Sequence, residues 1–188
     1  MDPGKAAKIA AKEAGEKPAP AGPAPEEISA STVGGVNPGT LNTTVPINLC
    51  FSVTVSSPDL EYLDRFSADL PDGWTVNSVN SAGDEGCGYG STQGVAAGNV
   101  VYWQNVDYPC SGCGSWSSGT YSFCCSVTLP ACTGAPFNLS WLIEGACWGS
   151  GSQSVMGTVG PISCTAGPPM LSLVPRLVTM FRWAPEPA

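Results

Sequence analysis

The chain has 188 residues with 23 glycines, 18 prolines, nine cysteines and no histidine, and its formal net charge is −8. Arg65 is the only base between Ser29 and Cys164, against nine acids, so this region repels phosphate backbones and anionic membrane surfaces. The composition argues against nucleic-acid binding and excludes Ser-His-Asp and Cys-His catalysis, and no run reaches the roughly 18 apolar residues that membrane insertion needs.

Residues 1–27 are expected to form a flexible leader. All four lysines lie within its first 17 residues, and Pro18–Pro25 alternates proline with small residues, which is typical of an extended polyproline-like spacer. No signal-peptide pattern is visible at the N-terminus. The chain is therefore interpreted as a fragment of a longer secreted protein or as having a non-native start, with reduced cysteines as the alternative.

Two long strands are predicted, at 44–56 and 120–129, because apolar side chains occupy every second position from Val45 to Val55 and from Tyr121 to Leu129. Shorter strands are expected at 28–33, 61–70, 74–79, 99–104, 137–144 and 153–162. Residues 80–97 and 107–118 read as long loops, and Trp74, Trp103 and Trp141 as core residues.

No long helical pattern separates these strands, so the sequence predicts an all-β fold, an antiparallel sandwich of seven to eight strands over residues 28–164. Residues 165–188 are expected to form a C-terminal tail outside the fold. The alternative for the apolar part of that tail, Met170–Trp183, is that it packs against a neighbouring domain or a partner.

The cysteine density predicts an oxidising compartment and disulfides. Alternation places Cys50 and Cys124 on the outer faces of the two long strands. If these strands are neighbours, a Cys50–Cys124 disulfide is geometrically possible. The alternative is that Cys125, on the inner face, forms a disulfide. Cys132–Cys147 and Cys147–Cys164 are alternatives near strand ends, and one cysteine remains over. The cysteines expected to form disulfides, including those of the two loops, are Cys50, Cys87, Cys110, Cys113, Cys124, Cys125, Cys132, Cys147 and Cys164.

Metal and cofactor sites are not expected. Cys110-x-x-Cys113 has no second pair and no histidine to complete a zinc site, and a loop disulfide is the simpler interpretation. Asp59, Glu61 and Asp64 are candidate calcium ligands, because calcium binds clustered carboxylates. The alternative for these acids is a solvated surface.

Four aromatic residues of the Gly/Ser-rich loops could form a platform for sugar rings, or could instead cover disulfides and sheet edges. These candidate ligand-binding residues are Tyr89, Tyr108, Trp116 and Trp148.

The runs Cys50–Phe66, Asp69–Val76 and Gly98–Trp103 resemble Ig-like β-sandwich modules of bacterial secreted and cell-surface proteins, over about residues 40–164. The resemblance implies a spacer, adhesion or substrate-binding accessory domain, and it supplies no catalytic residue. With nine cysteines, the chain departs from the single Cys–Trp–Cys arrangement of antibody domains.

The expected function is a non-catalytic structural or adhesive module of a larger extracellular or cell-surface protein. Its expected partners are other domains or surface proteins. A carbohydrate-binding module that uses the loop aromatics, with glycans as ligands, is the alternative.

Overall fold

The computed structural model describes residues 28–42, 45–57, 62–80, 92–109, 114–130, 132, 134–147 and 154–165. The predicted leader and C-terminal tail lie outside this part of the chain. Within it the protein is all-β, and no helix there is long and apolar enough to cross a membrane.

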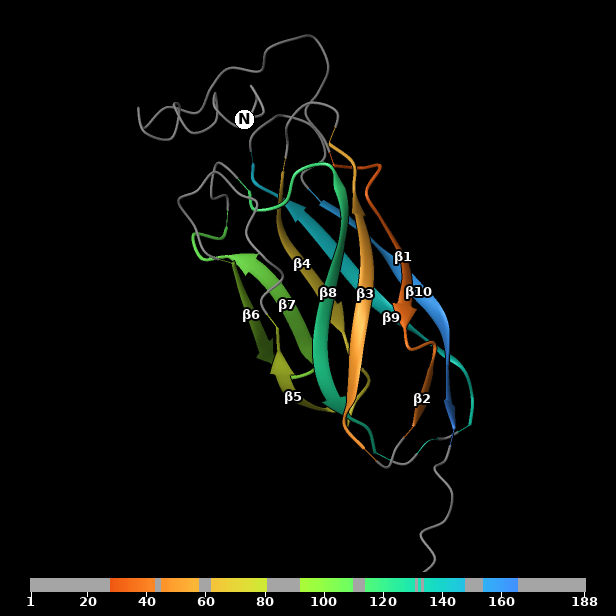
Figure 1. Cartoon of the computed structure of the whole chain (residues 1–188). Coiled ribbons are helices and arrows are strands. Elements are labelled where there is room, and N and C mark those ends of the chain that lie inside the picture. The colour runs from red at the N-terminus through yellow and green to blue at the C-terminus, as the bar shows by residue number, and fades with distance from the viewer. Residues whose placement is uncertain are drawn as a thin grey trace, which may run out of the picture.

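Ten strands form two sheets that pack face to face, with the four-stranded sheet in front of the six-stranded sheet in Figure 1. The four-stranded sheet has the order β1-β3-β8-β5 and the six-stranded sheet the order β2-β10-β9-β4-β7-β6. The strands are β1 (Thr32–Asn37), β2 (Thr40–Asn42), β3 (Ile47–Val55), β4 (Leu63–Asp69), β5 (Thr75–Val79), β6 (Thr92–Ala97), β7 (Val100–Asn105), β8 (Gly119–Thr128), β9 (Phe137–Gly145) and β10 (Ser154–Thr165).

The predicted Ig-like sandwich is therefore confirmed, but the described residues form ten strands rather than the expected seven to eight, since β2 and β6 were not among the expected strands. The pairs are antiparallel except β10–β2, which is parallel. β1 begins at Thr32 rather than at residue 28, and β6 lies inside the segment expected to be a loop. β6 has the sequence Thr-Gln-Gly-Val-Ala-Ala, which has few large apolar residues and no clear alternation. It is a strand because it pairs with β7.

The two long strands β3 and β8 are direct neighbours, and they pair residue by residue from Ile47↔Val127 to Val55↔Gly119. Their inward residues pack on the inward residues of β4 and β7. Phe66 lies at the centre of this core, with its ring centroid 5.1 Å from that of Phe123, 5.5 Å from Phe51 and 5.6 Å from Trp103. Strict alternation in the sequence thus becomes one shared apolar layer.

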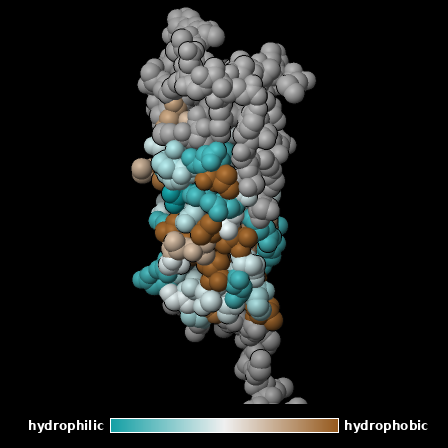
Figure 2. Space-filling view, turned by 90° about the vertical axis from the view of Figure 1, so that its left-hand side faces the viewer, coloured by the Kyte–Doolittle hydropathy of each residue, from teal (hydrophilic) through white to brown (hydrophobic). Residues whose placement is uncertain are grey.

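β5 and β6 are the edge strands on one side of the sandwich, and they contact each other across the two sheets. β7 also contacts β5, and the indole Nε1 of Trp103 on β7 donates a 2.7 Å hydrogen bond to the carbonyl oxygen of Asn80, directly after β5. On this side of the molecule apolar groups gather along the middle, with hydrophilic groups around them (Figure 2).

Candidate functional site

The outer face of the six-stranded sheet carries a charged and aromatic cluster that is formed by Arg65, Tyr102, Tyr108 and Glu144. Arg65 on β4 lies directly opposite Glu144 on β9 in the strand register. Its Nε is 3.7 Å from Glu144 Oε2, and the two side chains are 23 % and 24 % exposed. Neither of these two atoms has a hydrogen-bond partner, so the pair is held by charge and by its neighbours.

Two tyrosine rings hold the guanidinium of Arg65 in place. Its Cζ lies 4.4 Å from the ring centroid of Tyr102 and 4.9 Å from that of Tyr108, distances at which a cation is attracted to the face of a ring. The hydroxyl of Tyr108 donates a 2.9 Å hydrogen bond to Glu144 Oε1. The cluster is therefore a cation between two rings with a carboxylate beside it.

The electrostatics of the cluster act on Tyr108. Burial raises the pKa of this phenol above its ordinary value, because the charged phenolate loses hydration. The hydrogen bond with Arg65 lowers the pKa, whereas the hydrogen bond and charge of Glu144 raise it. Tyr108 therefore stays neutral at physiological pH and acts as a hydrogen-bond donor.

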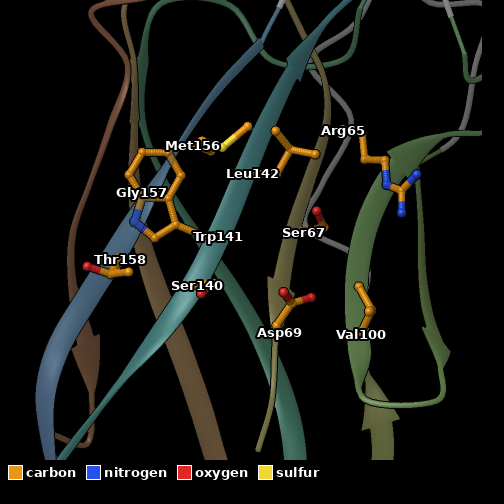
Figure 3. Close-up of a pocket in the computed structure, with 10 residues that line it drawn as sticks. All are labelled: Arg65, Ser67, Asp69, Val100, Ser140, Trp141, Leu142, Met156, Gly157 and Thr158. Carbon is orange, nitrogen blue, oxygen red and sulfur yellow. The ribbon is translucent and has the colours of Figure 1, made fainter.

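A depression of about 580 Å³ begins at Arg65 and crosses β4, β9 and β10 (Figure 3). Met156 is 75 % exposed and is one of its apolar residues, together with Leu142 and Val100. The polar lining consists of Arg65, Ser67, Asp69, Ser140 and Thr158. These residues alternate with inward residues along their strands, so the strand register brings them to one face.

Trp141 and Gly157 fix the spacing of β9 and β10 beneath this depression. The two residues are register partners, and the indole of Trp141 packs against the core. A Cβ atom at position 157 would lie 2.6 Å from Trp141 Cζ2, so only glycine leaves room for the ring. Trp141 is thus half-buried at the margin of the core rather than central to it; of the three tryptophans predicted for the core, Trp103 alone is fully buried.

Trp116, one of the predicted sugar-binding aromatics, is 0 % exposed, and that prediction is wrong for this residue. The backbone of Trp116 forms a bridge with Leu63, and its ring centroid lies 5.0 Å from that of Phe123 in the core. Gly114, with φ +64°, allows the backbone to pass close to Tyr62, since a Cβ at position 114 would lie 2.5 Å from Tyr62 Cβ. The loop therefore turns inward at this point.

The other predicted ligand residues are not brought together in the described part of the chain. Tyr108 belongs to the Arg65 cluster, and Tyr89 and Trp148 lie outside the described residues. Of the calcium candidates, Asp59 and Glu61 also lie outside them, and Asp64 is fully buried rather than on a solvated surface. Among the residues that are described, no group of three or more His, Cys, Asp or Glu side chains could hold a metal ion.

The structure contains the bridge Cys50–Cys124 that alternation suggested, with the two residues directly opposite each other on β3 and β8. A second disulfide joins Cys132 to Cys164. The alternatives Cys132–Cys147 and Cys147–Cys164 are therefore wrong, because Cys147 follows β9 at the end opposite to Cys132. Cys147 is itself disulfide-bonded.

Cys125 is buried with a free thiol, so the inward pairing suggested for it as an alternative is wrong. Burial raises its pKa to about 12. The remaining disulfide candidates, Cys87, Cys110 and Cys113, lie outside the described residues.

Sequence reasoning missed the Arg65 cluster. The signal was present, since Arg65 is the only base between Ser29 and Cys164 and an isolated cation in an acidic region needs partners. The alternation of residues 65, 67 and 69 with inward residues also placed them on one face. The register that brings β9 beside β4, however, depends on contacts between distant parts of the chain.

No protein-family model matches the chain, and no curated protein matches it. Among solved structures, a DUF4466 family protein from Parabacteroides merdae is 11 % identical with a TM-score of 0.39, over 74 % of this chain and 46 % of that one. The major pilin subunit of Bacillus cereus is 13 % identical with a TM-score of 0.43, over 71 % and 39 %. A non-cellulosomal cohesin from Archaeoglobus fulgidus is 11 % identical with a TM-score of 0.41, over 72 % and 91 %.

The chain thus spans less than half of the length of the first two of these proteins. At such low identity the similarity concerns the fold alone and assigns a role to no residue.

Proposed function

We propose that this chain is a non-catalytic structural or adhesive module of a larger extracellular or cell-surface protein, and that it binds a partner protein through the outer face of β4, β9 and β10. The observation that carries the proposal is Met156, which is 75 % exposed in a depression that also contains Leu142 and Val100. A large exposed apolar side chain within a concave patch that has polar groups around it is typical of a protein-binding surface.

The charges of this surface indicate the chemistry of the partner. Arg65 is already neutralised by Glu144, whereas Asp69 is an exposed carboxylate on the same face. The region from Ser29 to Cys164 also carries a large excess of acids. We therefore expect a partner that places an apolar side chain against Met156 and a basic side chain near Asp69, with association that weakens as salt is added.

The non-catalytic and extracellular parts of the proposal have separate support. A chain without histidine lacks the general base of most nucleophilic hydrolases. Two disulfides within the described residues favour an oxidising compartment. Incubation with peptide, ester and glycoside substrates should give no product above the rate of a heat-inactivated control, and turnover of any of them would contradict the first of these two points.

The binding face is testable with a displayed random-peptide library selected on the wild-type chain. Selected peptides should contain an apolar residue near a lysine or arginine, and they should bind Met156→Asp at least tenfold more weakly. Ser52→Asp is the matched control, because it adds the same charge on the outer face of the other sheet, where Ser52 is exposed. Peptides that lose affinity equally for both variants, or for neither, would contradict the proposal.

A further inference from the structure

A second pocket, of about 280 Å³, lies at the end of the sandwich where β8 ends, β9 begins and β10 ends, which is the lower end in Figure 1. Two aromatic rings form one wall. The ring centroids of Trp74 and Phe137 are 5.8 Å apart with their planes at 87°. A tight turn fixes the start of this wall, because the Trp74 amide donates a 3.3 Å hydrogen bond to the Pro71 carbonyl oxygen.

The rest of the pocket is apolar and rich in proline. Its remaining lining residues are Pro71, Asp72, Leu129, Pro130, Cys132, Ala135, Pro136 and Cys164. Asp72 is the only ionisable side chain among them, and it already accepts a hydrogen bond from the side chain of Asn99. A sugar needs several hydrogen-bonding partners, whereas an aromatic-lined groove with few polar groups suits a proline-containing segment in the polyproline conformation.

The chain itself delivers such a segment to the rim of this pocket. Cys164, whose disulfide to Cys132 anchors it, is part of the pocket wall. The next residue, Thr165, pairs with Asn42 of β2, and its Oγ1 donates a 3.2 Å hydrogen bond to the Leu41 carbonyl oxygen. β10 is therefore held up to its last residue, and the exit point of the chain is fixed.

Pro168, Pro169 and Met170 follow three to five residues after Thr165. At about 3.1 Å per residue in the polyproline conformation, they reach roughly 10–15 Å from that exit point. We propose that Pro168–Met170 binds in the pocket between Trp74 and Phe137 of the same chain. This contact sets the direction in which the apolar stretch Met170–Trp183 leaves the sandwich.

The other proline-rich segment, Pro18–Pro25, is the less suitable occupant. It precedes Ile28, which lies at the opposite end of the sandwich, where Ser31 Oγ accepts a 2.9 Å hydrogen bond from the Ser56 amide. The nine residues of β3 separate the two ends by about 30 Å. Pro18, ten residues before Ile28, reaches about 31 Å only with every intervening residue in the polyproline conformation, and the later prolines of this segment reach less. Binding within one chain would therefore need a fully extended leader.

The test uses the full chain labelled with 5-fluorotryptophan, which gives six ¹⁹F resonances from the six tryptophans. Trp74→Phe identifies the Trp74 resonance by its loss. The variant Pro168→Ser/Pro169→Ser/Met170→Ser should shift this resonance and leave that of the buried Trp103 unchanged. A synthetic peptide of residues 165–173 added to the variant should move the Trp74 resonance back. The three substitutions of this variant lie beyond β10, so we expect the sandwich to stay folded. A shift of the Trp74 resonance would then report the loss of the contact and not unfolding.

A matched control is Pro185→Ser/Pro187→Ser, which removes prolines from the same tail and should leave the Trp74 resonance in place. An unchanged resonance in the triple variant would overturn the proposal. Restoration by a peptide of residues 18–25 instead of 165–173 would also overturn it, since the occupant would then be the leader. The outcome is independent of whether the outer face of β4, β9 and β10 binds a partner.

Discussion

Trp116 shows how one residue departs from its local sequence pattern. Its Gly/Ser-rich surroundings are typical of an exposed loop. The structure instead buries the indole against Phe123, because Gly114 allows the backbone to approach Tyr62 and both Ser115 and Trp116 donate amide hydrogen bonds to the Leu63 carbonyl oxygen. No local pattern reports a contact that depends on a strand much earlier in the chain.

Trp116→Ala should lower the free energy of unfolding by about 3–5 kcal/mol, because a large buried ring is replaced by a cavity. Trp116→Phe should lose clearly less, since it keeps an aromatic ring at the same site. Urea unfolding of both variants measures the difference. If the alanine variant were as stable as the wild type, the side chain would be at the surface.

Tyr108 provides a second test at the scale of the residue. Its phenol pKa is raised, first by burial and further by Glu144. Glu144→Gln removes the negative charge, so we expect the pKa of Tyr108 to fall relative to the wild-type chain. Absorbance titration of the phenolate band measures this, with Tyr108→Phe identifying the contribution of Tyr108 among the five tyrosines.

The same shift has a consequence for stability. Because the folded-state pKa lies above the unfolded value, the contribution of Tyr108 is complete below the unfolded pKa of about 10. It is lost as the pH rises from there through the folded pKa. The loss of stability above about pH 10 should therefore be smaller in Tyr108→Phe, and an equal loss in both chains would contradict the assigned environment.

At the scale of the element, alternation was the reliable signal and register was not. The apolar positions of residues 47–55 and 121–129 predicted β3 and β8 and also placed Cys50 and Cys125 on opposite faces, as the structure shows. β6 carries no such pattern, so its sequence predicts a loop. The candidate binding face needs β4 between β7 and β9, an order that only tertiary pairing determines.

Gly157 tests the β9–β10 register directly. Gly157→Ala should destabilise the chain by about 1–3 kcal/mol, because its Cβ would overlap the Trp141 ring. Trp141→Leu removes the obstacle, so the double variant should lose less stability than the sum of the two single variants. Simple additivity in thermal or urea unfolding would show that the two side chains do not meet.

At the scale of the whole molecule, the sandwich combines an aromatic core with disulfides, and the two whose partners are both described anchor different regions. Cys50–Cys124 links the central strands of the four-stranded sheet, and Cys132–Cys164 links the segment after β8 to the end of β10. The outer face of β4, β9 and β10 lies away from both of these bridges. Such a rigid, cross-linked scaffold with an exposed apolar depression suits a module that presents a binding surface.

The proposed extracellular module depends most directly on these disulfides, and peptide mapping tests whether they are present. The chain is unfolded without reductant, alkylated, digested and analysed by mass spectrometry. We predict peptides linked through Cys50–Cys124 and Cys132–Cys164, Cys147 protected from alkylation, and Cys125 alkylated. Alkylation of all nine cysteines would contradict the account, because a chain in which every thiol is free is not the extracellular module proposed here.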